Sequence, residues 1–76
     1  MTSQLDRITV NADVCGGRPC IRGLRIRVTD ILGMLAAGAS RQDILEDYPY
    51  LEDRDITAAL EFAALSADRR IIRAAE

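Results

Sequence analysis

The segment VCGGRPCIRGLRIRVTD, residues 14–30, marks where the chain changes from extended to helical patterning. Its glycines and its proline are typical of turns. In its second half, apolar residues and arginines alternate, which is the spacing of a strand with one apolar face. The apolar members are Leu24, Ile26 and Val28, and the arginines between them are Arg25 and Arg27. With shorter strand signals at residues 8–10 and 20–22, this pattern predicts a turn-rich β arm over residues 7–28.

After the arm, the apolar residues follow a helical period. We predict helices over residues 29–38, over 40–48, and over about 53–65 or beyond. The last two are joined by a tight connection that contains Pro49, which is the outline of a helix-turn-helix. The predicted fold is therefore mainly α, a single domain over residues 1–76 with a three-helix bundle and an N-terminal β arm.

The ends of the predicted helices carry recognisable signals. Thr29 is a plausible N-cap for the first helix, and Gly38 is expected to end it. Ser40 should cap the second helix, because Asp43 stands where a capping box places its acid. Pro49 should stop that helix.

The arm presents more apolar surface than a two-stranded sheet can hide. Isolated two-stranded sheets are marginal in water, and unpaired strand edges invite pairing with another chain. We therefore expect a homodimer formed through residues 7–28, which would complete the sheet across a two-fold axis.

Composition narrows the possible functions. The chain has 76 residues, a net charge of −2 and no histidine, so the commonest transition-metal ligand and general base are missing. No signal peptide is visible, and no apolar run approaches the ~20 residues that span a bilayer. We expect a non-enzymatic cytoplasmic protein that uses no cofactor and no metal and has no membrane segment.

The glycines and cysteines of residues 14–30 have several possible roles. A phosphate-binding loop would need a Gly-Lys-Ser/Thr sequence, which does not follow. Cys15 and Cys20 have four residues between them, and no further Cys or His completes a metal site. Nearby arginines would favour a reactive thiolate, but small packed cysteines are the simpler interpretation. The sequence leaves the redox state of the two cysteines open.

Charge is divided unevenly along the chain. Residues 1–28 contain five Arg and two acids (+3), whereas residues 29–76 contain five Arg and ten acids (−5). Two groups of arginines are candidate contacts. Those of the arm, for nucleic acid or for a partner's carboxylates, are Arg18, Arg22, Arg25 and Arg27. Those near the C-terminus, for a partner, are Arg69, Arg70 and Arg73. The arm arginines could instead form a solvated strand face or pair with acids of the helical half. The C-terminal arginines could instead be part of a solvent-exposed helix end.

The string GGRPCIRGLRIRV resembles the signature of domain of unknown function family 433, a group of small antitoxin-like proteins. The resemblance covers about residues 7–64. The matching positions of the arm are Gly16, Gly17, Pro19, Ile21, Gly23, Arg25, Ile26 and Val28. In the helical half, Gly38, Pro49, Leu51, Ile56, Ala59 and Leu60 match. Leu24 stands where the family usually has Thr, and Glu52 where a Thr or Ser N-cap is usual.

The resemblance implies a homeodomain-like fold and a partner of the PIN-like ribonuclease toxin class. The first functional hypothesis is therefore an antitoxin-like protein that neutralises such a toxin by direct binding, with Arg69, Arg70 and Arg73 opposing the toxin's metal-binding carboxylates. The second is a small repressor that binds operator DNA. The expected reading helix begins with Glu52, Asp53 and Asp55, which repel phosphates, so DNA would have to be bound by the arginine arm.

Overall fold

The computed structural model describes the backbone of residues 3–13 and 15–74, and the side chains of residues 3–13 and 16–67. Three helices follow a small N-terminal β arm. The helices are α1 (Val28–Ala36), α2 (Arg41–Asp47) and α3 (Asp53–Ala74). The arm contains the strands β1 (Ile8–Thr9) and β2 (Cys20–Ile21) and the single 3-10 turns η1 (Leu5–Arg7) and η2 (Cys15–Gly17). The predicted mainly α fold with a helix-turn-helix and a β arm is confirmed.

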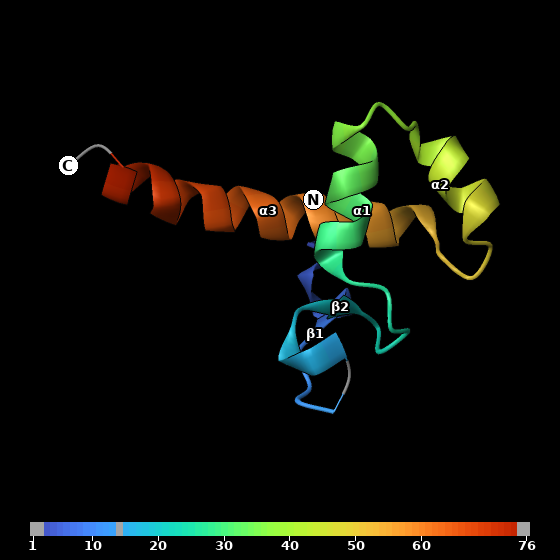
Figure 1. The fold of residues 1–76 in the computed structure, drawn as a ribbon, viewed down its shortest axis with the longest axis horizontal. Coiled ribbons are helices and arrows are strands. Elements are labelled where there is room, and N and C mark those ends of the chain that lie inside the picture. Colours follow the sequence, from blue (N-terminus) through green and yellow to red (C-terminus); the bar gives the residue numbers. More distant parts are fainter. Residues whose placement is uncertain (1–2, 14, 75–76) are drawn as a thin grey trace.

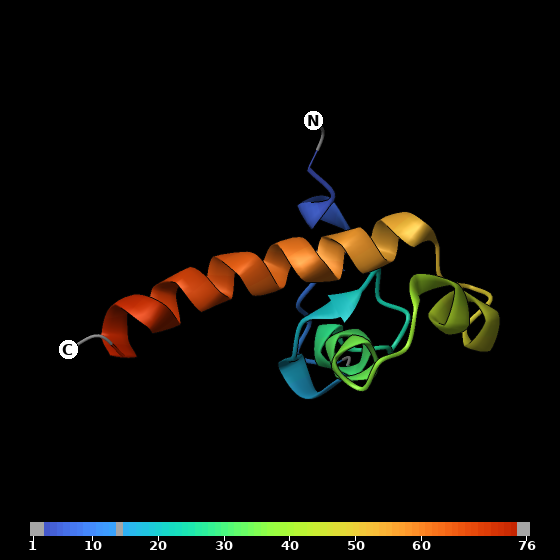
Figure 2. The same ribbon diagram turned by 90° about the horizontal axis from the view of Figure 1, so that it is seen from above.

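α3 is the axis on which the other elements are assembled. α1 crosses it, α2 lies near its N-terminal end, and the arm packs below the crossing point (Figure 1). Its 22 residues correspond to about 33 Å of helix, in a molecule whose longest extent is 42 Å. In both views the C-terminal half of α3 extends beyond the rest of the fold with no other element beside it (Figures 1 and 2). One half of the helix is therefore packed and the other half projects.

The hydrophobic core lies where the arm meets the three helices. Every one of these elements contributes to it: the buried cluster consists of Ile21, Ile26, Val28, Ile31, Ile44, Leu51, Ile56 and Ala59. Ile21, Ile31 and Ile56 have no exposed surface. Because the arm supplies part of this core, its apolar face is covered within one chain.

Each helix begins with an aspartate at its third position that accepts a hydrogen bond from the preceding turn. Asp30 accepts from the Arg27 N–H at 3.0 Å, Asp43 from the Ser40 N–H at 3.0 Å, and Asp55 from the Glu52 N–H at 2.8 Å. This contact satisfies a backbone donor that the helix leaves unpaired, and it places a negative charge at the positive end of the helix. The predicted Ser40 and Asp43 capping box is confirmed.

The prediction of Thr29 as N-cap was wrong, because α1 begins one residue earlier and Arg27 occupies the cap position. Asp30 accepts hydrogen bonds from both the backbone and the guanidinium of Arg27, which favours the earlier start. The C-terminal end of α1 is as predicted. Gly38 has φ +100° and donates to the Leu35 carbonyl, while Ala39 donates to the Met34 carbonyl. This is a Schellman motif, which requires a left-handed residue after the helix.

The predicted strand over residues 24–28 was also wrong. β1 and β2 pair antiparallel, with Ile8 opposite Ile21, and an isolated bridge joins Cys20 to Arg27, whereas residues 24–26 form no strand. Arg25 has φ +68°, a left-handed conformation that interrupts an extended chain. The alternation in burial nevertheless holds, because Ile26 and Val28 are buried while Arg25 is exposed. A turn has produced the inside–outside pattern that was attributed to a strand.

Candidate partner-binding surface

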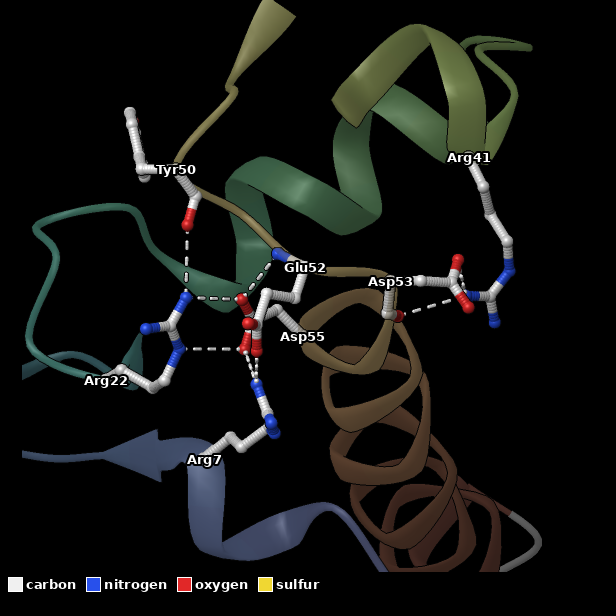
Figure 3. A network of polar contacts seen from close by, with 7 residues as sticks. All are labelled: Arg7, Arg22, Arg41, Tyr50, Glu52, Asp53 and Asp55. Atoms are coloured by element: carbon white, nitrogen blue, oxygen red, sulfur yellow. Dashed lines mark hydrogen bonds and ion pairs between the residues drawn. The ribbon is translucent and has the colours of Figure 1, made fainter. Parts of the chain in front are cut away.

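Two surfaces flank α3, and they use the arm's arginines in different ways. The first is an ion-pair cluster around the buried Asp55, here called the arm latch, formed by Arg7, Arg22, Glu52 and Asp55 (Figure 3). The second is an apolar hollow beside the projecting half of α3. The latch binds the arm to the rest of the fold, whereas the hollow opens to solvent.

Asp55 is the centre of the arm latch. Its side chain is fully buried and accepts hydrogen bonds from two arginines of the arm. Arg22 contacts both carboxylate oxygens, with Nη2 to Oδ2 at 2.7 Å and Nε to Oδ1 at 3.0 Å. Arg7 reaches Oδ1 at 2.9 Å and also bonds Glu52 at 2.6 Å. The same Asp55 accepts from the Glu52 N–H, so one carboxylate caps α3 and holds both ends of the β arm.

The electrostatics of the latch favour the ionised carboxylate. Burial by itself raises the pKa of Asp55, but the hydrogen bonds from Arg22, the Glu52 N–H and Arg7 outweigh it and lower the pKa below its ordinary value. The Arg22 guanidinium also donates to the Tyr50 carbonyl at 3.1 Å. Arg22 reaches these partners from a backbone with φ +46°, which an L-residue rarely adopts. The arm is therefore held by a strained residue with several strong contacts.

The four arm arginines divide into two pairs. Arg22 is committed to the latch, and Arg27 is paired with Asp30 at 3.1 Å. Arg18 and Arg25 are exposed, and neither forms an ion pair with any residue whose side chain the structure describes. Arg22 and Arg27 therefore pair with acids of the helical half, which was one of the alternatives for the arm arginines. Only Arg18 and Arg25 present their charges outward.

The apolar hollow has three sides and a volume of about 390 Å³. α1 contributes Val28, Thr29 and Leu32; α3 contributes Phe62, Ala63, Ser66 and Ala67; the segment before β2 contributes Arg18 and Pro19. Among the side chains that the structure describes, its lining is chiefly aliphatic and aromatic, and Arg18 is the one charged member. Because Phe62 and Leu32 are only partly buried, the hollow exposes apolar surface that the fold does not cover.

The sequence did not single out Arg7 or the residues that α3 contributes to the hollow. It marked Asp55 only as an acid at the start of the expected DNA-reading helix, although Asp55, Ala59, Phe62 and Ser66 follow one another at helical spacing. A charged residue at the head of such a stripe was the available signal for a buried pair.

The remaining predicted residues lie as follows. The glycines Gly16, Gly17, Gly23 and Gly38 all have positive φ, from +64° to +100°. Pro19 lies just before β2, and Pro49 lies between α2 and α3. The side chains of Arg69, Arg70 and Arg73, and that of Cys15, lie outside the described residues. Cys20 is buried, and its thiol donates to the Arg18 carbonyl at 3.3 Å.

The described part of the chain shows neither a membrane span nor a metal site. No helix in the described part of the chain combines the length and apolar character needed to span a membrane. Among the described side chains, no group of three His, Cys, Asp or Glu residues is arranged to hold a metal ion.

Comparison with known proteins identifies the family. The profile of the family described as "Protein of unknown function (DUF433)" matches residues 8–63. The chain belongs to the DUF433 family. The match includes the arm from β1 onward, α1, α2 and the packed half of α3. It ends at Ala63, which lines the hollow.

Two relatives support this assignment. The uncharacterised protein y4eO of Sinorhizobium fredii is 38% identical over 56 residues, which is 74% of this chain and 25% of that protein. The chain thus spans about a quarter of the curated relative that it matches. The crystal structure of a DUF433 member from Anabaena variabilis has a TM-score of 0.77 and 28% identity, covering 92% of this chain and 69% of that one.

Proposed function

We propose that this domain acts by binding another protein, as an antitoxin-like, non-enzymatic partner of a PIN-like ribonuclease. The observation that carries the proposal is the projecting half of α3, which leaves the fold along an uncovered apolar hollow. The class of partner comes from the resemblance of the sequence to antitoxin-like proteins.

Operator DNA remains the second candidate, through the exposed Arg18 and Arg25. Two observations make it the weaker one. Arg7, Arg22 and Arg27 are already paired with carboxylates, which neutralises three of the five arginines of residues 7–28. The start of α3, which would enter the major groove, exposes Glu52 and Asp53 and has Arg54 as its one basic residue.

The resemblance further suggests how a toxin would be silenced. PIN-like ribonucleases collect carboxylates around a divalent metal, and Arg69, Arg70 and Arg73 stand in the sequence of the last turns of α3. In this proposal the hollow holds the toxin while these arginines neutralise its active-site carboxylates.

A homodimer through residues 7–28 is a separate proposal. Its original reason was uncovered apolar surface on the arm, and Ile8, Ile21 and Ile26 pack against the helices of the same chain. The exposed Val10, next to β1 of this short two-stranded sheet, is what still favours it.

The proposed function can be tested by affinity capture from the native lysate, with and without nuclease. Two variants of α3 provide a matched pair. Ala63→Glu places a charge in the hollow, whereas Ala64→Glu makes the same change at the adjacent exposed position, which does not line it. We expect a ribonuclease to be retained after nuclease treatment, to be lost with Ala63→Glu and to be kept with Ala64→Glu. Capture of nucleic acid alone, abolished by nuclease, would instead favour the DNA candidate.

A further inference from the structure

We infer that the hollow receives an amphipathic α-helix of the partner protein, with an acidic side chain placed opposite Arg18. This inference rests on the proposed function and specifies what the partner presents to the surface. It follows from the backbone of the hollow, from the sizes of its lining side chains, and from its single charge.

The backbone around the hollow offers no edge for an extended strand. Two of its sides are helices, whose interior N–H and C=O groups are paired within the helix. On the third side, Pro19 has no N–H, and its carbonyl accepts from the Val28 N–H at 3.0 Å. The Arg18 carbonyl accepts from the Cys20 thiol. A strand would therefore find no continuous row of unpaired backbone groups here, which favours a segment that satisfies its own backbone, as a helix does.

The lining of the α3 side fits the approach of a second helix. Phe62 provides a large apolar contact at one end, and Ala63, Ser66 and Ala67 follow along the projecting half with small side chains. Small residues allow two helix axes to come within the usual 8–10 Å of each other. A partner helix lying there would cover these residues of α3 and lie beside the half that projects from the fold (Figures 1 and 2).

The charge of the hollow selects an acidic partner. Arg18 lines it, is exposed, and forms no ion pair with any side chain that the structure describes. The other polar contributions are the neutral hydroxyls of Thr29 and Ser66. Covering Arg18 with an apolar or basic helix would desolvate an unpaired cation, whereas a carboxylate would form a charge-assisted pair with it.

The inference is tested with two synthetic, fluorescein-labelled helices of about 20 residues, roughly 30 Å long. Both carry Leu and Ala on one face; the flanks of one carry Glu and those of the other carry Lys. Fluorescence anisotropy would measure their dissociation constants with the whole chain. We expect the acidic helix to bind at least about tenfold more tightly. Arg18→Glu should reverse that order, Ala63→Glu should abolish binding of both, and Ala64→Glu should change neither.

Several results would overturn the inference. Equal affinity for the two helices, or binding of neither, would remove the acidic helix as occupant. Sedimentation showing a dimer that Ala63→Glu dissociates and Ala64→Glu does not would assign the hollow to a second copy of the chain. If neither synthetic helix binds, but the wild type still captures the ribonuclease and Ala63→Glu does not, only the inference fails. If no protein is captured, the proposed function fails as well.

Discussion

Arg22 and Arg18 are four positions apart in the arm, yet they lie in opposite environments. Arg22 binds the buried Asp55 and holds the arm on the packed half of α3. Arg18 stands exposed at the rim of an apolar hollow beside the projecting half. The difference shows that the basic character of the arm is not one property, because part of it maintains the fold and part is available to a partner. The variants below should separate the two regions.

The largest effect is expected from Asp55→Ala. The substitution leaves Arg7, Arg22 and the Glu52 N–H without their common acceptor. Removing one partner of a buried ion pair typically costs about 3–5 kcal/mol, a large part of the stability of a small domain. The free energy of unfolding should be measured by urea denaturation followed by circular dichroism.

Asp53→Ala provides the control for this variant. Asp53 is two positions away and pairs with Arg41 at 2.8 Å, but its side chain is 64% exposed. Exposed pairs contribute about 0–1 kcal/mol, so this variant should unfold close to the wild-type midpoint. Similar losses in the two variants would mean that the arm latch does not dominate the attachment of the arm.

A smaller loss of stability is expected in acid. Because the pKa of Asp55 is lower in the folded state than in the unfolded chain, its contribution to stability is complete above the ordinary Asp value of 3.8. That contribution is lost as the pH falls through the folded-state pKa. The effect should be smaller than that of Asp55→Ala, since a protonated carboxyl still fills the site.

The measurement is the free energy of unfolding as a function of pH, in the wild type and in Asp55→Asn. The asparagine variant should show a shallower decline below about pH 4, with the remaining slope coming from Asp30, Asp43 and Glu52, whose pKa values are also lowered. Parallel curves for the two proteins would show that Asp55 is not responsible for the acid sensitivity.

A modest effect is expected from Phe62→Ala, at the border between the two halves of α3. Phe62 is partly buried, so its truncation should cost about 1–2 kcal/mol, whereas Ile56→Ala in the closed core should cost about 2–5 kcal/mol. Partner affinity should show the opposite order. Phe62→Ala should lose more affinity than Ile56→Ala, when both are measured under conditions in which they are folded. Equal costs for the two truncations would mean that the hollow is part of the closed core.

How far the fold could be predicted depended on the range of the interactions involved. Helical periodicity, Ser40 with Asp43, and Gly38 are local signals, and they located the helices and two of their ends. The arm latch joins Arg22 to a carboxylate 33 positions away, and no spacing rule connects them. Charge patterning identified the arginines of the arm as a group, but only tertiary contacts show which of them are already paired.

The incorrect strand has a similar physical origin. Alternating apolar and polar residues predict alternating burial, and a strand is only the commonest backbone that produces it. Here Gly23 and Arg25 take left-handed conformations, so a turn carries Ile26 into the core without extended pairing. Position 25 is an arginine, and only a glycine or an asparagine there would have predicted a left-handed conformation.

The smallest effect is expected from Arg25→Gly, and it should be stabilising. Glycine removes the cost of a left-handed conformation, about 1–2 kcal/mol, while the greater freedom of the unfolded chain offsets about 0.4–1 kcal/mol of that gain. The net gain should be at most about 1 kcal/mol, because Arg25 is exposed and has no ion pair among the described residues to lose. Arg18→Gly is the matched control: its φ is not positive, so the same change should destabilise the protein by about 0.5–1 kcal/mol. Thermal unfolding of the two variants should therefore shift in opposite directions. A loss of stability in both variants would indicate that the Arg25 side chain makes a structural contact. Of Arg18, Arg22, Arg25 and Arg27, only Arg18 would then have its charge available to a partner.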